Sequence, residues 1–237
     1  MPRARLAIAV SALAAGWLAA CAPAPAVPAA APGTASVAGT VRLVPHDGVP
    51  THAANDAYGD RRLRDVQLVD YSKPGTSVVY LDLGARPGGR ADLEVEDSLA
   101  GARLEPRFAV VGAGGEVAVA NRTRGEVVLS VPALARVERI APGAALALRA
   151  DQPGALDIYR LGADEPARVW VSPGPWVRPD ASGRFALTGL APGRVTLRAW
   201  HPRLPSAAAD VELRAGEIAI VDFEIGVGRG EKTHDAH

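Results

Sequence analysis

The chain has 237 residues with 26 basic and 26 acidic side chains, so its formal net charge is zero. Without a basic excess, electrostatic binding of nucleic acid or of anionic lipid headgroups is not expected. The one cysteine, Cys21, has no partner in the chain, which excludes an internal disulfide. Glycine (25 residues) and proline (20 residues) are frequent, as in chains built from short strands and turns.

The first 20 residues have the pattern of a secretory signal peptide. Arg3 and Arg5 precede an apolar run over 6–18, and small residues follow at 19 and 20. Removal of 1–20 takes two of the 26 basic residues and leaves a net charge of about −2. No later apolar stretch approaches the ~18 residues that a membrane-spanning helix needs.

The cysteine directly after this segment gives the signal a specific meaning. The sequence Leu18-Ala19-Ala20-Cys21 resembles the bacterial lipobox. This resemblance implies a diacylglycerol on Cys21 and attachment to a membrane through the acyl chains. Ala22 at the next position implies the outer membrane, with the protein on its periplasmic face. The alternative is an ordinary signal peptide cut at an Ala-x-Ala site, with Cys21 incidental.

The regions flanking the predicted body are not expected to pack. Residues 21–35 are rich in alanine and proline, which favours an extended tether. Residues 46–64 are polar and aperiodic and are predicted to form a long exposed loop. The last residues, 227–237, are predicted to be a flexible tail.

Between tether and tail, apolar residues alternate with polar ones, and turn sequences recur every eight to twelve residues. This pattern predicts an all-β protein of antiparallel β-sandwiches. Only the stretch 133–138 is expected to form a helical turn. The expected strands are 37–43, 66–70, 78–82, 91–96, 103–111, 115–121, 126–132, 144–149, 155–161, 167–172, 184–188, 194–201, 208–214 and 217–225.

The segment 100–178 resembles a cupredoxin-like domain of the methylamine-utilisation type. The resemblance rests on the strand and turn motifs at 104–111, 116–121, 128–130 and 169–171. It implies a sandwich with a copper centre at one end.

The four ligand positions of that family hold no copper ligands in this chain. They fall at Glu126, Tyr159, Gly162 and Glu165. A type 1 copper centre needs a thiolate and two imidazoles, and this segment contains neither cysteine nor histidine. The sequence therefore predicts a sandwich without a metal and without any cofactor beyond the acyl group on Cys21.

The segment 179–226 resembles the carboxypeptidase regulatory-like domain, a small transthyretin-like sandwich. Its motif is a turn at Gly183, a strand with Phe185 and Leu187, a turn at 192–193, and a strand that ends in Trp200. Strands in the N-terminal segment 36–99 resemble the start of a similar module. They are expected to complete this sandwich, with the stretch between them as an interruption.

Four residues form the candidate binding surface: Trp170, Trp176, Trp200 and His201. Exposed tryptophans at a sandwich edge stack on sugars or contact a partner protein, whereas core packing or turn capping is the alternative for Trp170 and Trp176. For Trp200 and His201, the alternative is a Trp that caps the sandwich end and a His that hydrogen-bonds a nearby loop.

Catalytic motifs are absent from the sequence. The sequence therefore predicts a non-enzymatic, lipid-anchored envelope protein that acts as a binding or structural β-sandwich module. An envelope protein or a glycan is the expected partner, besides the membrane. Two alternatives remain: a periplasmic metal or redox accessory protein related to methylamine-utilisation cupredoxins, and a carbohydrate-binding module.

Overall fold

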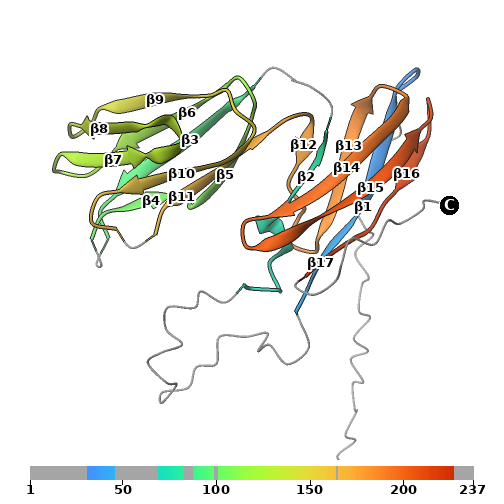
Figure 1. The fold of residues 1–237 in the computed structure, drawn as a ribbon, viewed down its shortest axis with the longest axis horizontal. Helices are drawn as coiled ribbons and strands as arrows, with labels where there is room; N and C mark the ends of the chain where they lie inside the picture. Colours follow the sequence, from blue (N-terminus) through green and yellow to red (C-terminus); the bar gives the residue numbers. More distant parts are fainter. Residues whose placement is uncertain (1–30, 46–68, 83–87, 99–100, 164, 227–237) are drawn as a thin grey trace, which may run out of the picture.

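The structure is a computed structural model that describes residues 31–45, 69–82, 88–98, 101–163 and 165–226. Within these ranges the chain forms short strands and two 3₁₀ turns, and the strands assemble into two β-sandwiches (Figure 1). The predicted all-β class is therefore confirmed.

Several predicted features lie outside the described residues. These are the signal segment, Cys21, most of the tether, the loop 46–64, most of the strand expected at 66–70, and the tail 227–237.

The terminal sandwich, as we name it, combines strands from both ends of the described chain. One of its sheets has the order β13-β1-β16, with β17 also paired to β1, and the other has the order β12-β2-β14-β15. Its strands are β1 (Ala35–Val44), β2 (Val78–Leu81), β12 (Trp176–Val177), β13 (Arg184–Leu190), β14 (Gly193–His201), β15 (Leu204–Leu213), β16 (Ile218–Ile220) and β17 (Phe223–Gly226).

The inserted sandwich contains every strand between β2 and β12. Its sheets have the orders β5-β11-β10-β7-β8 and β4-β3-β6-β9. Its strands are β3 (Arg90–Glu96), β4 (Arg103–Glu105), β5 (Phe108–Gly112), β6 (Gly115–Asn121), β7 (Val127–Val131), β8 (Arg136–Ile140), β9 (Ala145–Ala150), β10 (Gly154–Arg160) and β11 (Ala167–Ser172).

The chain therefore leaves the terminal sandwich and returns to it at one place. Strands β2 and β12 pair antiparallel, with Tyr80 opposite Trp176 and Val79 opposite Val177. In Figure 1 the inserted strands, green to yellow, lie together on one side of the blue and orange strands of the terminal sandwich. One sandwich is thus inserted into a strand pair of the other.

This arrangement differs from the segment boundaries expected at 36–99, 100–178 and 179–226. Strand β3, which falls in the first segment, pairs with β6 of the inserted sandwich. Strand β12, which falls in the second, belongs to the terminal sandwich. The N-terminal strands β1 and β2 pair with β13 and β14, so the ends of the chain build one sandwich.

Pairing and strand limits also differ in places from the expectation. Both sandwiches contain parallel pairs: β1 with β16 and β17, β3 with β6, and β5 with β11. The stretch expected as a helical turn at 133–138 is instead a short 3₁₀ turn, η3 (Pro132–Leu134), followed by β8. The expected strand 103–111 is divided at Pro106, which has no N–H to donate to a sheet.

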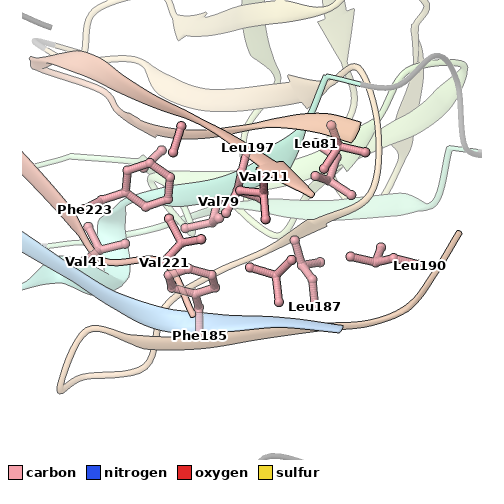
Figure 2. Packing of buried hydrophobic residues seen from close by; sticks show 14 of the residues in the cluster. Val41, Val79, Leu81, Phe185, Leu187, Leu190, Leu197, Val211, Val221 and Phe223 are labelled. Atoms are coloured by element: carbon pink, nitrogen blue, oxygen red, sulfur yellow. The ribbon is translucent and has the colours of Figure 1, made fainter. Parts of the chain in front are cut away.

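The core of the terminal sandwich lies between its two sheets and is filled by aliphatic side chains and two phenylalanines (Figure 2). Phe185 of β13 and Phe223 of β17, two strands that both pair with β1, have ring centroids 6.3 Å apart. Gly39 of β1 packs against the connection between β16 and β17. A Cβ at this position would overlap the carbonyl oxygen of Val221. The close approach of the two backbones therefore requires glycine at this position.

Candidate functional site

Four aromatic side chains connect the two sandwiches and form what we call the aromatic seam: Tyr80, Phe108, Trp170 and Trp200. The rings of Trp170 and Trp200 stack with centroids 4.0 Å apart and an interplanar angle of 21°. Phe108 lies 6.1 Å from Trp200 on one side, and Tyr80 lies 5.6 Å from Trp170 on the other. Each sandwich contributes two of the four rings.

Strand alternation explains why these rings face away from the sandwich cores. Val79 and Leu81 of β2 belong to the terminal core, which turns Val78 and Tyr80 outward. Val169 and Val171 of β11 likewise fill the inserted core and turn Trp170 outward. Strand β2 is apolar on both faces because each face is covered by protein, whereas the outward face of β11 carries Trp170 between Arg168 and Ser172.

Two arginines at the rim of the seam, Arg178 and Arg168, each contact the opposite sandwich. The Arg178 guanidinium lies 5.2 Å from the Phe108 ring centroid, a cation–π contact, and donates two hydrogen bonds, of 3.1 and 2.8 Å, to the carbonyl of Gly75. Gly75 belongs to the 3₁₀ turn η2 (Pro74–Thr76) of the terminal sandwich.

Arg168 of β11 forms a second polar link. Its guanidinium binds both carboxylate oxygens of Asp157, at 2.6 and 2.8 Å, and donates a third hydrogen bond, of 2.9 Å, to the carbonyl of Pro202. The bond to Asp157 raises the pKa of Arg168. The planar guanidinium of Arg168, with its N–H donors in a fixed geometry, thus holds the turn between β14 and β15 against the inserted sandwich.

The buried side chain of His201 also holds this turn, through hydrogen bonds within the terminal sandwich. Its Nδ1 accepts a hydrogen bond of 3.2 Å from the Arg203 backbone N–H, so the ring proton lies on Nε2. Nε2–H then donates to Thr76 Oγ1 at 3.0 Å, and that hydroxyl donates to the carbonyl of Lys73. Burial, together with the nearby charge of Arg203, lowers the pKa of His201 to about 4.

The structure divides the four predicted binding residues between buried and open positions. Trp170 and His201 are buried, with exposed fractions of 9% and 5%. Trp200 is half-buried in the seam, and Trp176 is the most open, at 36%. The expectation of one surface formed by all four is therefore not met, because three of them contact protein instead.

The four positions at which the sequence resemblance would place copper ligands lie directly before β7, on β10 and in the turn between β10 and β11. Tyr159 lies opposite Ser130 of β7, and Gly162 adopts a φ of +82° in the turn. Glu126 lies 2.8 Å from the Arg139 guanidinium, and Glu165 forms an ion pair with Arg107. Among the described residues no group of three His, Cys, Asp or Glu side chains is placed to hold a metal ion.

Sequence reasoning did not identify Tyr80, Phe108, Arg168 or Arg178 as interface residues. The available signal was the run of consecutive apolar residues at 78–81 and at 169–171, where neighbouring positions on both faces of the strand are apolar. Such a run indicates a strand covered on both faces, although it does not show which other segment covers it.

We expect Trp200→Ala to weaken the connection between the sandwiches. The substitution removes the contacts with Trp170 and Phe108, which should lower the unfolding free energy by about 2–3 kcal/mol. Calorimetry should then show two thermal transitions, one for each sandwich, where the native chain unfolds in one.

Trp176→Ala is the matched control, because it removes a tryptophan that takes no part in the ring stacking of the seam. Its effect should stay within about 1 kcal/mol. A single transition at the native temperature in Trp200→Ala would contradict this role of the seam.

His201 should make the fold sensitive to acid. An unfolded histidine takes up its proton near pH 6.5 and folded His201 near pH 4, so the stabilisation is complete above pH 6.5 and is lost as the pH falls toward 4. Urea unfolding at pH 7 and pH 4.5 should differ by up to about 2 kcal/mol more in the native chain than in His201→Gln. Equal pH dependence in both proteins would show that folding does not lower the pKa of His201, which would contradict this prediction.

Comparisons with known proteins give matches among solved structures. No protein-family model and no curated protein matches the sequence. Among solved structures, a purple cupredoxin from Nitrosopumilus maritimus matches with 15% identity and a TM-score of 0.30, covering 35% of this chain and 99% of that chain. The all-β fold itself is established by the strand pairing described above.

Proposed function

We propose that this chain is a lipid-anchored β-sandwich protein of the bacterial cell envelope, which binds or positions a partner and carries out neither catalysis nor copper chemistry. The partner would be an envelope protein or a glycan. The membrane would be contacted through acyl chains rather than through a protein surface.

The observation that carries this proposal is the chemistry of the four positions at which the sequence resemblance would place copper ligands. These positions offer a phenol, a glycine and two carboxylates. Glu126 and Glu165 are both engaged by arginine. Such hard, neutralised oxygen donors do not suit copper, which prefers thiolate and imidazole. The sandwich therefore supplies shape and surface at the place where a redox protein would hold its metal.

The proposed anchor comes from the sequence. Cys21 follows a signal-like segment and precedes a proline-rich stretch that leads to β1 of the terminal sandwich. Two or three acyl chains, at about 0.8 kcal/mol for each buried CH₂, would hold the protein at a bilayer. No helix among the described residues is long and apolar enough to span a membrane.

Carbohydrate binding is a second candidate, favoured by the exposure of Trp176. Its indole lies beside Tyr80 on the face of the sheet that carries the seam, on the short edge strand β12, and is 36% exposed. An indole exposed at a sheet edge offers the flat apolar surface on which a sugar ring stacks. Trp170, buried in the seam, would not take part.

We expect Cys21→Ser to release the protein from the membrane. In the native chain, metabolically supplied palmitate should label the protein, and the protein should sediment with the outer membrane. In Cys21→Ser both properties should be lost, because serine does not form the thioether to diacylglycerol. A variant that still sediments with the membrane, or a native N-terminus that mass spectrometry places elsewhere, would contradict the anchor.

We also expect the full chain, purified in detergent and dialysed against copper and then against a chelator, to retain far less than one copper per molecule. Its visible spectrum should lack an intense blue or purple band, since no thiolate–copper bond is formed. Stoichiometric copper that survives the chelator would contradict the proposed function and favour the metal or redox accessory role.

A further inference from the structure

The edge strand β8 carries one of the most exposed apolar side chains in the described part of the chain. Val137, in the middle of this strand, is 70% exposed. It lies in one row with Ser130 of β7 and Tyr159 of β10, and Tyr159 is itself 40% exposed. Two exposed apolar side chains therefore flank Ser130 on the outer face of the sheet, and one of them, Val137, lies on the edge strand.

The edge beside Val137 is open among the described strands. The five-stranded sheet has the order β5-β11-β10-β7-β8, so β8 pairs with β7 on one side and with no described strand on the other. Alternate N–H and C=O groups on that side are free to pair with another strand. Charged side chains often protect an edge strand against pairing with another chain. On β8, two side chains of opposite charge lie close together instead.

Arg136 and Glu138 lie on either side of Val137 and carry opposite charges. Their side chains pair within the strand, at 2.9 and 2.6 Å from Glu138 Oε1. The sequence Arg136-Val137-Glu138 is therefore self-complementary for an antiparallel partner. If two such strands pair about Val137, each Arg136 lies opposite Glu138 of the other copy, and the two valines face each other.

We propose that β8 is a self-association edge, at which a second copy of this chain adds its own β8 antiparallel about a two-fold axis through Val137. The two five-stranded sheets become one continuous sheet. The apolar pair at the centre and the two Arg–Glu pairs beside it select the register, since a shift by two residues places like charges or an unmatched valine opposite one another. The small size of the contact makes the dimer a weak one.

The first test uses the position of Val137 on the axis. Directly opposed residues in antiparallel strands have Cα atoms about 4.5–5.5 Å apart, within the range for a disulfide. Val137→Cys in the full chain, expressed in its own cell envelope, should form a reducible covalent dimer with a 137–137 link that mass spectrometry identifies. Ile220→Cys is the matched control, since Ile220 is 64% exposed but lies in the terminal sandwich.

The second test uses the charges. Equilibrium sedimentation of the purified full chain in detergent should show a monomer–dimer equilibrium. Arg136→Glu should raise its dissociation constant about tenfold or more, because two like-charge pairs then oppose each other. The double variant Arg136→Glu with Glu138→Arg should restore the native value.

Three results would overturn the proposal: a monomer at every concentration, equal crosslinking at 137 and 220, or a double variant as weak as the single one. A crosslink from 137 to a different protein would also overturn it. Because these experiments use neither the Cys21 anchor nor copper, their outcome is independent of the proposed function.

Discussion

The stacking of Trp170 on Trp200 is the contact on which the arrangement of the two sandwiches depends. Both covalent connections to the inserted sandwich leave from one strand pair, β2 and β12, so the chain itself fixes only a single edge. Orientation about that edge must come from noncovalent contacts. The stacked indoles, whose ring centroids are 4.0 Å apart, supply such contacts, and the rings of Tyr80 and Phe108 extend them to both sides. Aromatic rings suit this role because they bury a large area with few rotatable bonds.

The polar groups around the seam hold the turns that carry it. Arg178 reaches the η2 turn and Arg168 reaches the turn after β14, while His201 connects those same two turns from the inside. His201 remains neutral at ordinary pH because a buried imidazolium beside Arg203 would be costly. The turn after β14 is thus fixed by Arg168 of the inserted sandwich and by His201 of its own, whereas the η2 turn is fixed by two side chains of the terminal sandwich, of which Arg178 also contacts Phe108 across the seam. This shared support explains how a small aromatic contact is kept in a single geometry.

Much of the fold followed from the sequence, and the part that did not has a physical reason. Alternation in β1, β6 and β14 predicted their strands, because valine and leucine side chains lie on the core face of each and mostly small or polar side chains lie on the other. The resemblance led to the expectation that the N-terminal strands complete the terminal sandwich, but the sequence does not show which strands are neighbours, so the places of β3 and β12 were not predicted. Strand β8 was missed because alanines before it suggested a helix, although pairing with β7 outweighs that local preference. The seam was missed for a related reason: local pattern shows that Trp170 and Trp200 lie on strands, but not that they meet.

The insertion also relates the proposed anchor to the proposed edge. The chain enters the terminal sandwich at β1, directly after the proline-rich stretch that follows Cys21, whereas β8 belongs to the inserted sandwich. A lipid on Cys21 would therefore restrain one sandwich, and the other would be placed relative to the bilayer only through the seam. With a fixed seam, neighbouring copies on one membrane would present β8 at similar heights. Weak pairing between copies becomes effective under this condition, because tethering to a surface raises the local concentration of matching edges.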